Sequence, residues 1–291
     1  MVKKSMALVL DSCVDLPTEY VQHDFVRVIP LNITFKSGST IQDGIDITTE
    51  QFYKKMSQEK KLPVTSQPSP EQFYTVYEQL LKQYKTVVSF HLASALSGTY
   101  NSAMLAKQMV AEKDQHRIIL IDSKAVSLVE GFMAIEIIKC IKSKKSLEHI
   151  QSVVVELQKK YTCLIIPDTL ENLKKGGRIS HLGALLGGLL QIKPILIVGN
   201  KKDGYMDIYT KARGKKKAFA TMLNTAKNDA FNIENQTIGV VHSCVDNNEE
   251  LNEKLNIVKK ELNPKEIIVS LVGATVGTHL GLNGFGIIYK E

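Results

Sequence analysis

Short apolar runs of strand length alternate with helical patterns along the whole chain. Eight such runs lie at residues 6–11, 26–35, 86–92, 117–122, 162–167, 193–198, 237–243 and 266–272. Amphipathic segments of helical period separate most of them. This alternation predicts an α/β fold in which most strands pair in parallel, because parallel neighbours need a crossover between them.

A helix with a well-marked start is predicted after residue 69. Ser69 and Gln72 have the spacing of a capping box, and Pro70 stands at the first helical position. Apolar residues then recur on one face, at positions 73, 76, 77, 80 and 81. We expect that face to pack on a sheet.

The chain is long enough for two domains, and the polar stretch 142–160 is the best place for a boundary. We expect an N-terminal domain over 1–160 with a doubly wound, mostly parallel sheet. The C-terminal domain over 161–291 contains two adjacent strands, 192–198 and 206–211, joined by a turn at 200–204. That hairpin predicts a mixed sheet.

Composition argues against disorder and gives no indication of nucleic acid as a partner. The 291 residues are 44% hydrophobic and 23% charged, and 37 Lys and Arg against 30 Asp and Glu give a net charge of +7. Trp is absent, and basic residues are not interleaved with aromatic ones. One basic cluster, at positions 211, 213, 215, 216 and 217, is either a solvated helix start or a docking surface for an acidic partner.

The apolar runs and the cysteines indicate where the protein acts. The N-terminal run ends at Asp11, too early for a signal peptide or a membrane span, and the other runs are short or interrupted. We therefore expect a cytoplasmic protein. Cys13, Cys140, Cys163 and Cys244 have no C-x-x-C spacing, so we expect neither a disulfide nor a zinc site.

Motifs of the commonest enzymes and nucleotide sites are absent from the sequence. It contains no G-x-x-x-x-G-K-[ST], H-E-x-x-H, G-x-S-x-G or EF-hand spacing. The GLNGFG segment at 281–286 does not match the dinucleotide pattern G-x-G-x-x-G. We expect no cofactor.

Two short polar segments are candidate ligand loops at strand ends, where α/β folds bind their ligands. In the first, Thr65 and Ser66 precede Gln67-Pro68. These two residues either end a loop and cap the helix that follows, or their hydroxyl groups face a ligand. In the second, Ser97 and Gly98 lie between a strand and a helix, where backbone N–H groups can receive an anion. Ser97 could equally be an ordinary N-cap.

The third candidate is the segment 273–286, which contains five glycines and His279. This density of glycine predicts tight turns or a close approach of the backbone to another group. His279 is either a structural histidine or a ligand contact.

Together these loops supply neutral hydrogen-bond donors and one imidazole. That set suits holding a carboxylate or a phosphate better than breaking a bond. The alternative is a serine esterase or thioesterase with Ser97 as nucleophile and His279 as base, although Ser97 is not on a G-x-S-x-G elbow. A binder of a small phosphate or a nucleotide at the Ser97 helix start is a third possibility.

Seven motifs, in order, resemble those of the DegV family, the fatty-acid-binding subunits of bacterial fatty acid kinase. They are DSCVDLP from Asp11, IQDGIDI from Ile41, TSQPSP from Thr65, LSGTYNSA from Leu96, LKKGGRIS from Leu173, IKPIL from Ile192 and GTHLGLNGFG from Gly277. The resemblance covers essentially the whole chain. Three departures are Leu282-Asn283 in place of a usual Pro-Gly, Gly214 in place of a common threonine, and Cys13 in place of serine or threonine.

The resemblance implies a two-domain α/β carrier that binds a long-chain fatty acid in a tunnel between its domains, with no catalysis of its own. By the match of motifs, the carboxylate contacts fall on Thr65, Ser97 and His279, with Ser66 and Gly98 beside them.

The resemblance also implies partners. A separate ATP-dependent kinase subunit would convert the presented carboxylate into an acyl phosphate for phospholipid synthesis. Arg178 and Arg213 match arginines near the head group or the kinase-docking face. The basic residues around Arg213 could also steer the chain to an anionic membrane surface for loading.

Overall fold

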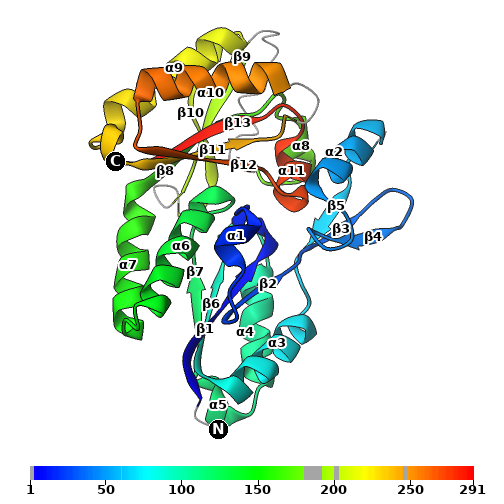
Figure 1. Ribbon diagram of the computed structural model, residues 1–291. Helices are drawn as coiled ribbons and strands as arrows, with labels where there is room; N and C mark the ends of the chain where they lie inside the picture. The colour runs from blue at the N-terminus through cyan, green and yellow to red at the C-terminus, as the bar shows by residue number, and fades with distance from the viewer. Residues whose placement is uncertain (1–2, 60, 180–191, 200–202, 245–247) are drawn as a thin grey trace.

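The computed structural model describes residues 3–59, 61–179, 192–199, 203–244 and 248–291. Within these ranges the strands form a four-stranded, a six-stranded and a three-stranded sheet. The two larger sheets lie one above the other in Figure 1, and the three-stranded sheet projects to one side.

The four-stranded sheet is parallel throughout, with strand order β2-β1-β6-β7. Its strands are β1 (Lys4–Asp11), β2 (Val26–Ile29), β6 (Tyr84–His91) and β7 (Ile118–Asp122). Alternate residues of β1 face opposite sides, as the period of a strand requires. Ala7 and Val9 pack with α3 (Pro70–Gln83) and α4 (Thr99–Met109), whereas Leu8 and Leu10 pack with α6 (Leu128–Lys142). The sheet is thus doubly wound.

Helix α6 lies between the two larger sheets and is buried on nearly all sides. Its apolar side chains share one core with strands of both sheets and with α7 (Leu147–Lys160). A helix that packs on both faces needs apolar residues all round, and the segment LVEGFMAIEIIKCIK supplies them.

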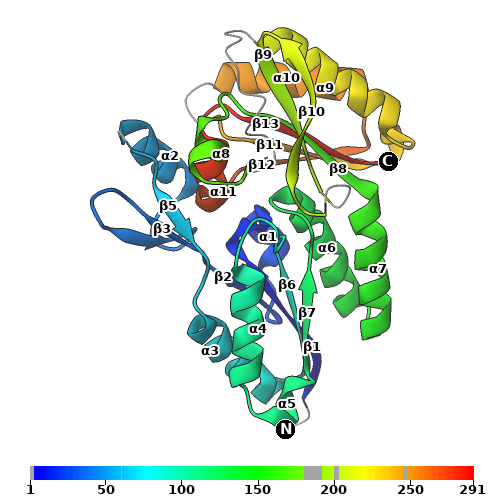
Figure 2. The same ribbon diagram turned by 180° about the vertical axis from the view of Figure 1, so that it is seen from behind.

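The six-stranded sheet is mixed, with order β10-β9-β8-β13-β11-β12, and only β11 and β12 among its neighbours run parallel. Its strands are β8 (Tyr161–Ile166), β9 (Ile192–Val198), β10 (Met206–Arg213), β11 (Thr237–His242), β12 (Glu266–Leu271) and β13 (Phe285–Lys290). Helices α9 (Lys215–Asp229) and α10 (Asn248–Leu262) cover its outer face, at the top of Figures 1 and 2.

The small sheet has the order β4-β3-β5 and is antiparallel. It consists of β3 (Asn32–Thr34), β4 (Thr40–Gln42) and β5 (Val64–Ser66). Beside it lie α2 (Thr49–Gln58), α8 (Glu171–Lys175) and α11 (Ala274–Leu280), clearest in Figure 2. The remaining short elements are η1 (Ser12–Val14), α1 (Thr18–Val21), α5 (Glu112–Gln115) and η4 (Ile233–Asn235).

The expected fold class is confirmed: a doubly wound parallel sheet accompanies a mixed sheet. The 192–198 and 206–211 hairpin forms as β9 and β10, and Ser69 and Gln72 make the predicted capping box. Part of the hairpin's turn, residues 200–202, lies outside the described residues.

One local prediction is wrong. The run 26–35 is not one strand: Pro30 has no N–H for a ladder, and Ser12 Oγ accepts the N–H of Leu31 at 3.1 Å, so β2 ends and β3 joins another sheet. In the glycine-rich segment 273–286 the predicted close approach occurs, because a Cβ on Gly273, Gly277, Gly284 or Gly286 would lie less than 3.0 Å from a neighbouring atom. The segment also contains α11 and the start of β13, which the sequence did not predict. No described helix is long and apolar enough to cross a membrane.

Candidate functional site

A cavity of about 60 Å³ lies at the carboxyl edge of the parallel sheet, where the three sheets come together. Segments following β1, β6 and β7 contribute one side, and α11 and the segment after α8 contribute another. The sequence-predicted residues Thr65, Ser66, Ser97, Arg178 and His279 all line it. The apolar part of the wall includes Leu31, Leu92, Leu96, Val126, Leu173, Met206 and Val276.

Thr65 and His279 are in direct contact although 214 residues separate them in the chain. Thr65 Oγ1 and His279 Nε2 are 2.8 Å apart. The prediction that Thr65 follows the end of a strand is wrong, because Thr65 lies within β5. Pairing with β3 keeps its backbone extended. His279 shares one face of α11 with Thr275 and Val276, as the i, i+3 and i+4 spacing requires.

The imidazole of His279 is neutral near pH 7. Burial, and secondarily the positive charge of Arg178, lowers the pKa of His279 to about 4. Its Nδ1 atom is buried and has no hydrogen-bond partner among the described residues. A Cβ atom on Gly176 would lie 2.2 Å from Nδ1, so glycine at position 176 gives the ring its space.

The Ser97 loop approaches the Thr65 segment from the other side. Ser97 Oγ lies 2.9 Å from Thr99 Oγ1 and accepts the Thr99 N–H at 3.3 Å, while Gly98 is the N-cap of α4. A Cβ on Gly98 would lie 2.7 Å from the amide nitrogen of Gln67. The two loops thus pack closely because residue 98 has no side chain.

The two arginines have different settings. Arg178 lines the cavity and donates from Nε to the carbonyl of Leu96 at 3.1 Å, and from Nη1 to the carbonyl of Gly176. It thereby ties the end of α8 to the Ser97 loop. Arg213 is exposed at the end of β10, opposite Ile192 in the β9 register, and does not line the cavity.

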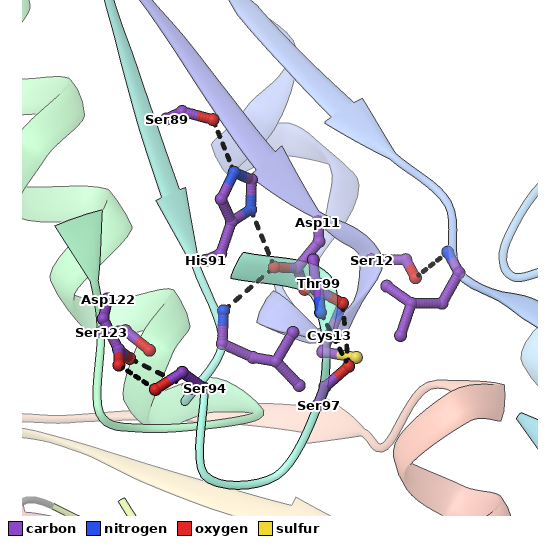
Figure 3. Close-up of polar contacts among 12 residues, drawn as sticks. Asp11, Ser12, Cys13, Ser89, His91, Ser94, Ser97, Thr99, Asp122 and Ser123 are labelled. Atoms are coloured by element: carbon purple, nitrogen blue, oxygen red, sulfur yellow. Dashed lines mark hydrogen bonds and ion pairs between the residues drawn. The ribbon is translucent and has the colours of Figure 1, made fainter. Parts of the chain in front are cut away.

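A fully buried chain of polar side chains, drawn in Figure 3, supports two residues of the cavity wall. Ser89 Oγ lies 2.5 Å from His91 Nε2, and His91 Nδ1 lies 3.1 Å from Asp11 Oδ2. Asp11 also accepts the N–H groups of Leu92 and Cys13 at 3.0 Å each, and both of those residues line the cavity. These residues have the order of a Ser-His-Asp triad, but Asp11, Ser89 and His91 are 0% exposed and are therefore structural.

The esterase alternative receives little support from this geometry. His279 contacts Thr65 rather than Ser97, and its Nδ1 lacks an orienting acid among the described residues. A histidine with a pKa near 4 is also a weak base at neutral pH. The described residues contain no group of three or more His, Cys, Asp or Glu side chains placed to hold a metal ion.

Fold and site together define an α/β protein with a small, donor-lined cavity where its sheets meet. The family model described as "Uncharacterised protein, DegV family" matches residues 5–291. A DegV domain-containing protein of Caldanaerobacter subterraneus is 35% identical over 288 residues, covering 99% of both chains. Protein DegV of Bacillus subtilis is 33% identical, covering 98% of this chain and 99% of its own. The chain belongs to the DegV family.

Solved structures of relatives have the same fold. A structure described as fatty acid binding of a DegV family protein from Thermus thermophilus has a TM-score of 0.87 and 31% identity, covering 99% of this chain and 100% of the other. A stearic acid-binding protein from Eubacterium ventriosum has a TM-score of 0.88 and 28% identity, covering 98% of each chain.

Proposed function

We propose that this protein binds a long-chain fatty acid and holds its carboxylate in the cavity beside Thr65, Ser97 and His279. The observation that carries the proposal is the convergence of these three residues, from distant parts of the chain, on one cavity whose wall also includes seven apolar side chains. Relatives described as fatty-acid-binding proteins support the choice of ligand. We infer a carrier without catalysis of its own.

The contacts of His279 indicate which groups would donate hydrogen bonds to the carboxylate. A buried N–H without an acceptor is rarer in proteins than an acceptor without a donor, so we assign the proton to Nε2. Nε2–H then donates to Thr65 Oγ1, and the Thr65 hydroxyl donates onward to a carboxylate oxygen. Ser97 Oγ–H and a backbone N–H near Gly98 supply further donors, which replace the water lost on burial.

The acyl tail needs more room than the 60 Å³ of this cavity. A groove of about 770 Å³ lies between α9, α10 and the mixed sheet. Asp168 and Asn283 line this groove. Along the chain they are five residues from Leu173 and four residues from His279, respectively, and those two residues line the head-group cavity. We propose that the tunnel expected between the domains continues into this groove.

The groove has the length of a tail site, and the apolar part of its wall includes Ile166, Phe219, Leu223, Ile257 and Phe285. Lys215 and Lys227 both line it, and the twelve steps between them along α9 rise about 18 Å. An extended chain of about fourteen methylenes has a similar length, at roughly 1.3 Å per bond. Burying those methylenes contributes on the order of 11 kcal/mol of gross driving force, so the tail supplies the affinity.

We further propose that an ATP-dependent kinase subunit takes the presented carboxylate to form an acyl phosphate, in the cytoplasm. Arg178 would lie beside the reacting head group, and the exposed cluster of Lys211, Arg213 and Lys215–Lys217 would dock an acidic face of the kinase or an anionic membrane. High salt should then abolish kinase coupling without releasing the lipid.

Removing one head-group donor tests the function. Thr65→Ala should weaken palmitate binding at least tenfold, because a hydrogen bond to a charged group contributes about 1.5–3 kcal/mol. Thr65→Ser, which keeps the hydroxyl, should stay within threefold of wild type. Titration against a displaced fluorescent fatty acid measures both.

Ser97→Ala should give a similar loss, and Ser94→Ala is its matched control. Ser94 lies in the same loop, but it is exposed and its hydroxyl donates to Asp122 at 2.5 Å. Wild-type affinity in both Thr65→Ala and Ser97→Ala would show that the carboxylate lies elsewhere.

Blocking the groove tests the tail. Ala220 is exposed on α9 and lines the groove about one third of the way along. Ala220→Trp should weaken palmitate binding at least tenfold and leave octanoate unaffected, whereas Lys217→Trp on a face outside the groove should change neither. Equal loss for both ligands would contradict the assignment of the tail.

A further inference from the structure

Three consecutive backbone N–H groups at the start of α11 donate to two buried carboxyl groups from the N-terminal part of the chain. Gly273 N donates to Asp15 Oδ1 at 2.8 Å. Ala274 N and Thr275 N donate to Asp43 Oδ1 and Oδ2 at 3.2 and 3.0 Å. Asp15 and Asp43 are 7% and 5% exposed, so these contacts are shielded from water.

Both carboxyl groups are themselves held in place. Ser127 Oγ lies 2.5 Å from Asp15 Oδ2, and the Ser270 hydroxyl donates to the Asp15 carbonyl. The Ser12 hydroxyl lies 3.2 Å from Asp43 Oδ2. Ser12, Asp15 and Asp43 belong to the motifs DSCVDLP and IQDGIDI, and the proposed head-group site assigns no role to any of these three residues.

The start of α11 determines where His279 lies. The helix has only seven residues, so a rotation or shift of its first turn is transmitted to the imidazole at its end. Gly277 packs so closely on Tyr53 that a Cβ there would lie 2.2 Å from the Tyr53 hydroxyl oxygen. The helix is thus fixed by contacts at its start and along its side.

We propose that Asp15 and Asp43 are positioning residues of the head-group site: by holding the first turn of α11 they aim His279 at Thr65. This inference rests on the proposed function. It assigns to the two motifs a task that links the N-terminal part of the chain to the imidazole of the C-terminal part.

The two carboxyl groups have different charge states. Burial, together with the negative charges of Asp43 and Asp11, raises the pKa of Asp15 to about 8, although the hydrogen bonds to Ser127 and Gly273 lower it. The other titratable groups facing Asp15 are Cys13 on its own segment, Tyr53 on α2 and Glu130 on α6. Burial also raises the pKa of Asp43, but the two backbone N–H groups at the helix start and the Ser12 hydroxyl lower it, so we assign the proton to Asp15 and the charge to Asp43.

This assignment predicts opposite results for two similar substitutions. Asp15→Asn replaces a neutral acid with a neutral amide and should stay within threefold of wild type in palmitate affinity at pH 7. Asp43→Asn places an amide NH₂ against a backbone N–H and should weaken palmitate at least tenfold. Hexadecanol, which has the tail but no carboxylate, should bind both variants like wild type. Asp46→Asn, an exposed neighbour of Asp43, is the control.

The pH dependence of unfolding provides a second readout. Because the folded-state pKa of Asp15 is above its ordinary value of 3.8, the folded protein retains a proton that the unfolded chain releases between about pH 4 and 8. Wild-type stability should therefore fall as pH rises through that window, and the fall should be smaller in Asp15→Asn.

The outcomes distinguish a failure of the positioning role of Asp15 and Asp43 from a failure of fatty-acid binding itself. If Asp43→Asn does not fold, Ser12→Ala tests the same contact and should weaken palmitate about threefold to tenfold. Wild-type palmitate affinity in Asp43→Asn and Ser12→Ala, or equal loss of hexadecanol, overturns the positioning role while leaving the function intact. Failure of the wild-type protein to bind palmitate overturns the function itself.

Discussion

Gly277→Ala should lower the free energy of unfolding by about 1–3 kcal/mol, the range for overpacking a tight core. Alanine is the better helix former by about 1 kcal/mol, so this substitution in α11 would stabilise an uncrowded helix. Here the new Cβ would lie 2.2 Å from the hydroxyl oxygen of Tyr53, which is 0% exposed and donates to the Val272 carbonyl at 3.0 Å. Denaturant unfolding of the two proteins measures the difference.

A second substitution tests whether that clash is the cause. Tyr53→Phe removes the hydroxyl, the atom nearest the added Cβ, and leaves the ring carbon Cζ at 2.7 Å. The double variant Gly277→Ala/Tyr53→Phe should therefore recover part of the loss and be more stable than the sum of the two single losses predicts. Strict additivity would show that the Tyr53 hydroxyl does not limit residue 277.

Gly176→Ala should reduce fatty-acid affinity at least tenfold with a smaller effect on stability. The added Cβ would lie 2.2 Å from His279 Nδ1 and 2.8 Å from Cε1, so the ring cannot keep the position in which Nε2 contacts Thr65 Oγ1. Without that hydrogen bond the Thr65 hydroxyl loses its orientation towards the carboxylate. Isothermal titration with oleate measures the loss.

The neighbouring Lys175→Ala is the control for Gly176→Ala. Lys175 is exposed, and its ion pair with Glu171 lies on the surface, where such pairs contribute little to the free energy of unfolding. Oleate affinity should remain at the wild-type value in the control. Unchanged affinity in Gly176→Ala as well would mean that the position of the imidazole does not govern head-group binding.

The sequence predicts the larger elements well because their signals are local. Most of the apolar runs coincide with strands, and the capping box at Ser69 forms as expected. The run 26–35 misleads because its composition suits one strand, whereas Pro30 and the Ser12 hydroxyl end the ladder. β13 and α11 are missed because glycine-rich sequence favours neither element by itself, and tertiary contacts decide both.

The sequence predicts which residues form the candidate site, but it does not predict how they are arranged in space. Thr65, Ser97 and His279 are recognisable from their loops and from the family resemblance. Their convergence, and the Thr65–His279 contact in particular, depends on pairing between segments more than 200 residues apart. No local pattern marks Asp15 or Asp43 as an anchor of α11, because the groups that they bind are backbone N–H groups.

The central claim is that a fatty-acid carboxylate lies against Thr65, Ser97 and His279. The ¹³C resonance of oleate labelled at its carboxyl carbon, bound to the protein, reports that environment directly. We expect a single bound resonance, distinct from free oleate, that moves in both Thr65→Ala and Ser97→Ala and stays in place in Ser94→Ala. A bound resonance that neither substitution moves, or no bound resonance at all, would contradict the account.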